Sequence, residues 1–359
     1  MTRPPRSFPP AAEARGCAFT LALGLLVPVG VVVFTWLSCG GLSWVTATLT
    51  LGFVLAAVGL CGRALLLVRG TKLLWLSGIL VAAPLLLRAV SVGDVEGVAL
   101  VTLPRASASR LLSRLYPEPD GVLLAATLIS RTGRLRDPEV SRFAQILEQA
   151  YARSAPSPAS VPTPAINTYL GLQGPSGFDV VTIRPPTDQA DAGVIFLHGY
   201  AGNFYVYCWE FAQAAAVAKL VTLCPSLDAS GAWWTQRGRQ TLSATLDYAK
   251  TLGLRRLYLA GLSNGAAGAS TLVRTFERQL SGLVLVSGVG ESDAPAIPVL
   301  VVQGSADRMM SAPRARAYSA GRANVRYHEL EGGHLIFLSQ FSQVRPLIAA
   351  FLGELERGR

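Results

Sequence analysis

The segment LYLAGLSNGAAGAS, Leu257–Ser270, decides the fold. A run of strand-forming apolar residues leads directly into GLSNG (261–265), and an alanine-rich segment of helix-forming composition follows. In this context of strand, cramped turn and helix, a G-x-S-x-G motif holds a serine hydroxyl at the carboxyl edge of a sheet. The same letters also occur in ordinary turns, and the chain has 35 glycines. The neighbouring sequence decides between these interpretations.

Short apolar segments alternate with helical segments from Ile166 onward. This pattern predicts an α/β domain over residues 166–359, with a mostly parallel sheet and helices on both faces. Strands are expected at 178–184, 194–197, 220–224, 256–260, 282–287, 299–303 and 325–330. Helices are expected near 205–218, 235–252, 265–279, 312–320 and 335–352. A domain of this length can bury one sizeable core.

The N-terminal part is more apolar than a soluble domain, and hydrophobic residues make up 51% of the 359-residue chain. Segments 18–37 and 42–62 carry no charge and are about 20 residues long, which is enough to cross a hydrocarbon core. A third segment, 73–87, needs flanking residues to do so. We therefore predict a membrane region over residues 1–90 with two or three transmembrane helices. The alternative, a signal peptide followed by buried core helices, explains only the first segment.

Basic residues around these segments predict the topology of an integral membrane protein. Three arginines precede the first segment, and Arg63, Arg69 and Lys72 lie between the second and third. This pattern places the N-terminus in the cytoplasm. Three spans would make the α/β domain extracytoplasmic, whereas two would leave it in the cytoplasm. The net charge of +10 lies mostly in residues 1–165, which fits contact with the lipid bilayer better than with nucleic acid.

Two segments connect the membrane region to the α/β domain. Residues 91–153 show helical periodicity and are predicted to form a helical connecting region, with a helix start at Asp137-Pro138-Glu139. Residues 154–165, rich in Pro, Ser and Ala, are predicted to form a stiff linker.

Two of the five cysteines, Cys208 and Cys224, fall in the α/β domain. The sequence favours two buried thiols there, with a disulfide as the alternative if the domain is extracytoplasmic. The oligomeric state stays open.

With the motif in this setting, residues 169–355 resemble the α/β-hydrolase family of serine hydrolases. The resemblance implies a nucleophilic serine, then an acid, then a histidine in chain order, and an oxyanion hole supplied in part by an earlier loop. Ser263 is the nucleophile that it indicates. It implies no metal and no organic cofactor.

The chain offers only three histidines as the general base. His334 lies in EGGHLIF, between the last predicted strand and the C-terminal helix, where the family carries its catalytic histidine. A plain surface-loop residue is the alternative. His328 lies inside a predicted strand, and His198 ends the strand VIFLHG.

Asp307 is the predicted acid because it follows the apolar strand IPVLVV and a Gly-Ser-Ala turn. Its carboxylate would orient His334 and stabilise the imidazolium. A turn-forming or helix-capping role is the alternative for Asp307, and Asp293 is the competing acid.

The segment FLHGYAGNF (196–204) resembles the HG loop of the family. The backbone N–H of Tyr200 or Ala201, together with that of Asn264, is predicted to form the oxyanion hole, although the glycines could mark only a tight turn. His198 would brace this loop. Nearby aromatic residues either line a substrate pocket or pack in the core: Tyr205, Tyr207, Trp209, Trp233 and Trp234.

These features predict a membrane-anchored, esterase- or lipase-like serine hydrolase that cleaves a carboxylic ester of a small-molecule acyl substrate. Peptidase or thioesterase activity would use the same residues, and a non-catalytic scaffold is the remaining alternative. Only residues 288–297 separate the two strands between which many lipases insert a lid. We therefore expect an open site unless residues 91–153 fold over it.

Overall fold

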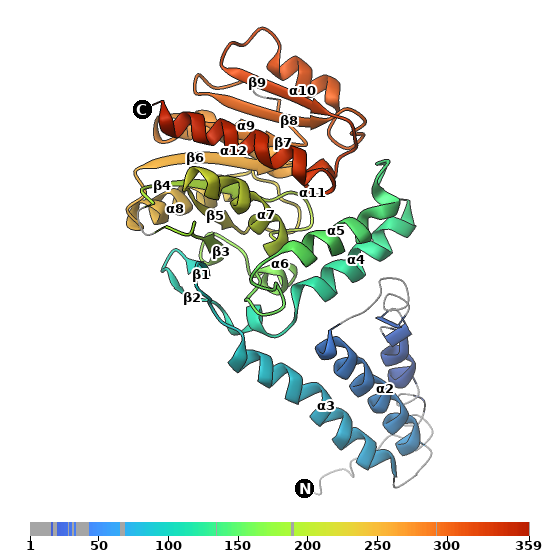
Figure 1. Cartoon of the computed structure of the whole chain (residues 1–359). Helices are drawn as coiled ribbons and strands as arrows, with labels where there is room; N and C mark the ends of the chain where they lie inside the picture. The colour runs from blue at the N-terminus through green and yellow to red at the C-terminus, as the bar shows by residue number, and fades with distance from the viewer. Residues whose placement is uncertain are drawn as a thin grey trace, which may run out of the picture. The chain divides into compact units, whose positions relative to one another are not determined.

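The computed structural model describes residues 43–64, 69–133, 135–187, 190–291 and 293–358, together with 16, 20–27, 29–30 and 32–33. The chain forms two compact units, Met1–Val90 and Ser91–Arg359 (Figure 1).

The first unit contains the helices α2 (Trp44–Ala64) and α3 (Arg69–Ser91). Both are long and apolar enough to cross a membrane, over Trp44–Arg63 and Thr71–Ser91. Their large apolar side chains are mostly exposed or half-buried, unlike those of a soluble core helix; Trp75 is 74% exposed and Ile79 61%. The predicted segment 73–87 lies inside the longer α3. Within the predicted segment 18–37, residues 20–27, 29–30 and 32–33 are helical, and the others lie outside the described residues.

Among the described residues of the second unit, nine strands form one sheet in the order β2-β1-β3-β5-β4-β6-β7-β8-β9. The strands are β1 (Val98–Leu103), β2 (Ser107–Ala108), β3 (Phe178–Ile183), β4 (Ala192–Leu197), β5 (Val221–Pro225), β6 (Arg256–Leu262), β7 (Leu283–Val286), β8 (Val299–Gly304) and β9 (Val325–Leu330). From β5 to β9 in this order, neighbouring strands are parallel, whereas β1 and β3 run antiparallel to their neighbours. The strands predicted after residue 166 are confirmed as β3 to β9, and the domain has the α/β-hydrolase fold.

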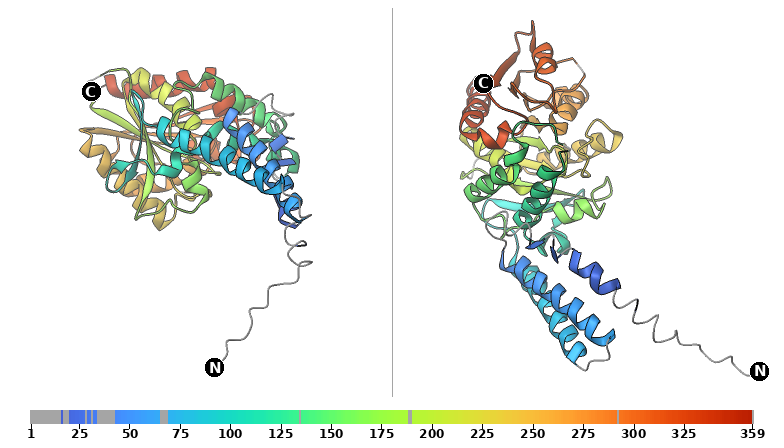
Figure 2. Two further views of the ribbon diagram at one scale, coloured as in Figure 1. Left: turned by 90° about the horizontal axis from the view of Figure 1, so that it is seen from below. Right: turned by 90° about the vertical axis from the view of Figure 1, so that its right-hand side faces the viewer.

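Helices cover both faces of the sheet, because side chains alternate along each strand (Figure 2). Val194 and Phe196 of β4 enter the core under α7 (Tyr205–Ala215) and α12 (Phe341–Arg357). On the other face of the sheet, α8 (Gln236–Thr251) and α9 (Asn264–Phe276) cover β4, and α10 (Ala312–Ser319) covers β8 and β9.

Residues 91–165, which include the predicted connecting region and linker, belong to this second unit. The strand β1 pairs with β3 along its whole length. The helices α4 (Glu118–Thr132), α5 (Phe143–Arg153) and α6 (Ala165–Tyr169) follow, and α4 and α5 contribute buried residues to the core on the α7 face of the sheet. Within residues 154–165, the predicted linker, Val161 and Thr163 are buried.

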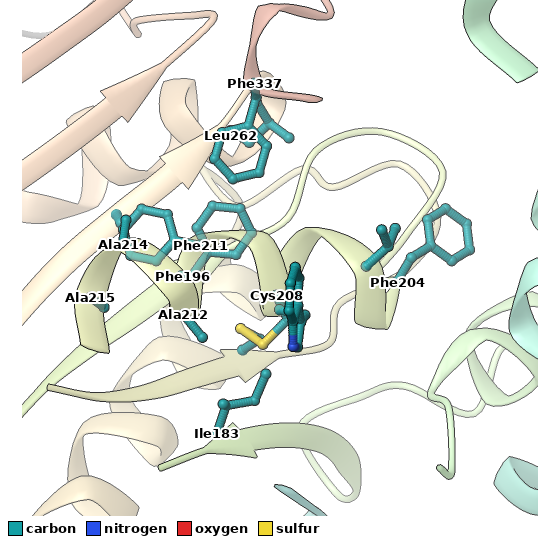
Figure 3. Close-up of a cluster of buried hydrophobic side chains, with 14 of the residues drawn as sticks. Ile183, Phe196, Phe204, Cys208, Phe211, Ala212, Ala214, Ala215, Leu262 and Phe337 are labelled. Atoms are coloured by element: carbon teal, nitrogen blue, oxygen red, sulfur yellow. A yellow bond between two sulfur atoms is a disulfide. The ribbon is translucent and has the colours of Figure 1, made fainter. Parts of the chain in front are cut away.

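Cys208 of α7 and Cys224 of β5 form a disulfide beneath the aromatic core (Figure 3). The prediction of two buried thiols is therefore wrong, and the alternative holds. The sequence did not indicate that α7 lies over β5, which brings the two Cα atoms to 6.0 Å, within bonding range.

Candidate functional site

Ser263 lies at the sharp turn between β6 and α9, with φ 55° and ψ −119°. This is a conformation that residues with a side chain rarely adopt. The turn also requires its two glycines. A Cβ on Gly261 would lie 2.3 Å from the Gly265 carbonyl oxygen, and one on Gly265 would lie 2.0 Å from the Leu197 carbonyl oxygen. The GLSNG sequence therefore permits the close packing that presents Ser263 at the sheet edge.

The structure brings Ser263, His334 and Asp307 together from three separate turns. His334 Nε2 lies 2.8 Å from Ser263 Oγ, and His334 Nδ1 lies 2.8 Å from Asp307 Oδ2. All three side chains are buried. Since a carboxylate only accepts, Nδ1–H donates to Asp307, which leaves Nε2 of the neutral ring to accept the serine proton.

Further hydrogen bonds fix the Asp307 carboxylate. Its Oδ2 also accepts from Gln303 Nε2 at 2.8 Å, and its Oδ1 accepts from the backbone N–H groups of Met309 and Met310, each at 2.8 Å. The competing acid, Asp293, is 75% exposed and pairs with Arg322 at 2.9 Å. Of the two candidate acids, Asp307 is therefore the one that contacts His334.

A carboxylate that the sequence analysis did not assign to the site holds the His334 backbone. Asp137 Oδ2 accepts from the N–H of His334 at 2.5 Å, and Glu139 Oε2 accepts from that of Gly333 at 3.1 Å. Asp137 is buried, and its Oδ1 accepts from the N–H of Glu139 at 2.9 Å. Asp137, at the predicted helix start, thus closes a local turn and also holds the loop that carries His334. No local signal indicates the second contact, because the two residues are 197 positions apart.

The predicted oxyanion donors differ in their availability. The N–H of Ala201 donates to the Ala229 carbonyl at 2.7 Å, so Ala201 is not a suitable donor. Tyr200 remains as the predicted donor from this loop. Asn264 is the first residue of α9, a position where the N–H has no partner within the helix. Tyr200 lines the same pocket as Ser263 and His334.

His198 lies under this loop and uses both ring nitrogens locally. Its Nε2 accepts from the N–H of Leu227 at 3.0 Å, and its Nδ1 lies 2.7 Å from the Gly199 carbonyl oxygen. Burial lowers the pKa of His198 to about 4, so the ring is neutral near pH 7. His198 thus braces the loop. The remaining histidine, His328, is exposed on β9.

A pocket of about 110 Å³ surrounds Ser263 and His334. Ile129, Leu135 and Phe143 line it, so residues 91–153 do lie against the site, as the sequence analysis allowed. Of the aromatic set, Tyr207 lines this pocket. Trp233, in contrast, is fully buried and packs against His198.

Among known proteins, no family model and no curated protein matches this chain. Solved structures do match it over about half its length. Est1E from Butyrivibrio proteoclasticus with bound ferulic acid is 16% identical, and the match covers 51% of this chain and 96% of that chain with a TM-score of 0.45. A serine hydrolase homologue from Coxiella burnetii is 19% identical over 50% and 93%, with a TM-score of 0.42. A thermophilic esterase from Thermogutta terrifontis is 13% identical over 51% and 96%, with a TM-score of 0.41.

Proposed function

We propose that this chain is a membrane-anchored serine hydrolase that cleaves carboxylic esters, with Ser263, His334 and Asp307 as its catalytic residues. The observation that carries the proposal is the continuous hydrogen-bond chain from Ser263 Oγ through both nitrogens of His334 to Asp307. A serine hydroxyl needs an adjacent base to act as a nucleophile, and this chain supplies one whose tautomer is fixed.

In the first half-reaction, Ser263 Oγ forms a bond to the ester carbonyl carbon while His334 Nε2 takes the hydroxyl proton. The carbonyl oxygen becomes an oxyanion, which the N–H groups of Tyr200 and Asn264 would stabilise. The C–O bond to the alcohol then breaks, and His334 returns the proton to that leaving group. Asp307 stabilises the imidazolium that exists between these transfers.

In the second half-reaction, water replaces the alcohol. His334 takes a proton from the water as its oxygen bonds to the acyl carbon, and the proton then passes to Ser263 Oγ as the acyl–oxygen bond breaks. The carboxylic acid leaves, and the hydroxyl is restored. Thioester or peptide hydrolysis would follow the same steps.

The test is hydrolysis of p-nitrophenyl butyrate by the full chain in lipid nanodiscs. Ser263→Ala and His334→Ala should each lower kcat/KM by about 10⁴-fold or more, and Asp307→Asn by roughly 10³- to 10⁴-fold. Matched controls are Ser319→Ala on α10, His328→Ala on β9 and Asp293→Asn, which should stay within twofold of the native chain. Native activity that survives in Ser263→Ala would reject the assignment. Complete inactivity of the native chain on esters, thioesters and peptides would favour the scaffold alternative.

We further propose that the chain has three membrane spans and that residues 91–359 are extracytoplasmic. The distribution of basic residues around the apolar segments supports this topology. The Cys208–Cys224 disulfide supports it independently, because disulfides persist mainly in oxidising compartments.

Protease added to sealed right-side-out vesicles tests this topology. The proposal predicts digestion of residues 91–359 without detergent. Protection that is lost only when detergent is added would instead require two spans and a cytoplasmic domain.

A further inference from the structure

A second cavity of about 350 Å³ adjoins the pocket that contains Ser263 and His334. Both are lined by the same group of residues at their junction: Ile129, Phe143, Tyr200, Ala201 and Tyr207. The two cavities therefore lie next to each other, with these residues at their shared boundary. The volume lies within the range of about 300 to 1,000 Å³ that small-molecule sites occupy.

The helix α4 gives this cavity an elongated wall. The lining residues on α4 recur at helical spacing: Glu118, Gly121, Val122, Ala125, Ala126 and Ile129. Such spacing places them on one face of the helix, and the length from Glu118 to Ile129 is about 16 Å at 1.5 Å per residue. Ile129 lines both cavities, so this face leads from the Ser263 pocket to the position of Glu118. The glycine and two alanines on this face leave space for a ligand.

The cavity offers an apolar surface, although Glu118 lies in its wall. Both carboxylate oxygens of Glu118 are occupied by protein donors. Oε1 accepts from Tyr151 Oη at 2.9 Å and from the N–H of Val206 at 3.3 Å. Oε2 accepts from Thr163 Oγ1 and, at 2.9 Å, from the N–H of Tyr205. The remaining lining residues are mainly aliphatic and aromatic, so the cavity fits a hydrocarbon better than a charged group.

We propose that this cavity, bounded by α4, binds the linear acyl chain of the ester substrate. The inference rests on the proposed function, because the chain enters only as part of an ester at Ser263. At roughly 30 Å³ per methylene, similar to the volume of a water molecule in the liquid, the cavity holds on the order of ten carbon atoms. The substrate class is therefore a medium-chain acyl ester, and its extended shape suits the cavity better than a compact aryl acid does.

The test compares kcat/KM for p-nitrophenyl butyrate, decanoate and benzoate with the full chain in lipid nanodiscs. Burial of one methylene raises kcat/KM by up to about fourfold, so decanoate should exceed butyrate by at least roughly tenfold even with partial burial. Benzoate should be no better than butyrate. Equal values for butyrate and decanoate, or a preference for benzoate, would overturn the proposal.

Variants with a larger side chain at position 125 fill the cavity and test whether it is the source of the decanoate preference. Ala125→Phe should lower the ratio of kcat/KM for decanoate to kcat/KM for butyrate to about one, because the ring occupies the cavity that would hold the longer chain. Ala152→Phe places the same ring on an exposed position of α5 and should keep the preference. Ala125→Leu is a smaller change and should reduce the decanoate preference partially. It keeps the test decisive if Ala125→Phe does not fold. An unchanged decanoate preference in both Ala125 variants would reject the cavity as the acyl site.

These outcomes separate the two proposals. If native chain and variants all hydrolyse butyrate through Ser263 but show no chain-length dependence, the proposed function holds and the acyl cavity fails. If Ser263→Ala hydrolyses both esters like the native chain, the proposed function fails, and the acyl cavity fails with it.

Discussion

The conformation of Ser263 is the feature on which the site depends at the scale of single residues. A non-glycine residue at φ 55° and ψ −119° carries backbone strain of about 1 to 3 kcal/mol. The neighbouring packing maintains this conformation, and the result is a hydroxyl directed at His334. Stability is thereby lost at the position where the proposed chemistry occurs.

This strain predicts an unusual order of stability for two inactive variants. Ser263→Gly should be more stable to unfolding than Ser263→Ala by about 1 kcal/mol, because glycine adopts this conformation without strain. At an unstrained position the order reverses, since glycine loses more chain entropy on folding than alanine. Chemical denaturation of both variants measures the difference. An alanine variant as stable as the glycine variant, or more so, would show that the turn is not strained.

Asp137 is a positioning residue, because it acts on His334 through the backbone and does not contact the reacting atoms. Ala at position 137 would leave the N–H of His334 unpaired and free the loop to shift. We expect Asp137→Ala to lower kcat by about 10- to 100-fold, because a displacement of a catalytic group by about 1 Å can lower the rate by up to about 100-fold. KM should stay within about threefold of the native value. Asp137→Asn retains an acceptor oxygen and should recover most of kcat.

The control for this prediction is Asp247→Ala, which removes an exposed carboxylate on α8 paired with Lys250. It should leave both kinetic constants unchanged. Equal losses in Asp137→Ala and Asp137→Asn, or a change confined to KM, would contradict the positioning role.

The residues of the candidate site differ in how far the sequence alone could predict them. Ser263, Asp307 and His334 each lie in a distinctive local sequence pattern. The expected chain order of serine, acid and histidine further limits which residues could form the site. The contact of Asp137 had no such pattern. Ala201 was indistinguishable from Tyr200 as an oxyanion donor until the hydrogen bond to Ala229 was known.

At the scale of secondary-structure elements, one ion pair joins α5 to α7. Arg153 Nη2 lies 2.7 Å from Oε1 of Glu210, whose side chain is fully buried. The second carboxylate oxygen, Oε2, has no hydrogen-bond partner among the described residues. Burial raises the pKa of Glu210, whereas Arg153 and the more distant Arg345 lower it. The carboxylate thus depends mainly on Arg153 for compensation.

Arg153→Met should therefore destabilise the protein at neutral pH by about 2 to 3 kcal/mol, less than for a fully buried pair because Arg153 is partly exposed. In the variant, the pKa of Glu210 in the folded state rises further above its unfolded value. Such a group stabilises the fold at low pH and loses this contribution as pH rises through the folded pKa. The deficit relative to the native chain should accordingly shrink as the pH is lowered.

Denaturation at several pH values measures this deficit. The comparison variant is Arg326→Met, which breaks an exposed pair with Glu354 and should cost less than about 1 kcal/mol. A deficit for Arg153→Met that grows as pH falls would contradict the account of Glu210.

The elements of the sheet were predictable where each strand is a short apolar run between glycine-rich turns, as in β4, β6 and β8. The strand β1, in contrast, follows an apolar helix, and its role depends on pairing with β3, far along the chain. The helix α4 contains Gly121 and two threonines, Thr127 and Thr132, which weaken its helical signal. The strand β1 and the helix α4 therefore depend on pairing and packing with distant parts of the chain, which local sequence patterns do not indicate.

At the scale of the whole molecule, the chain combines an apolar N-terminal unit with a unit that has the α/β-hydrolase fold. From the sequence we expected an apolar region before an α/β domain, because a charge-free run and an alternating pattern of strands and helices differ in composition. The sequence did not predict that the second unit begins at Ser91. Residues 91–165 complete the sheet, support His334 and contribute to the lining of both cavities, so this segment is part of the candidate site.

The central claim is that Ser263 is a nucleophile activated by His334. The most direct measurement is reaction of the full chain with a short-chain alkyl fluorophosphonate, followed by mass-spectrometric mapping of the adduct. The account predicts one phosphonyl group on Ser263 Oγ with loss of fluoride, and labelling at least about 10³-fold slower in His334→Ala. An adduct on another residue, or a native Ser263 that reacts no faster than Ser263 in the His334→Ala chain, would contradict it.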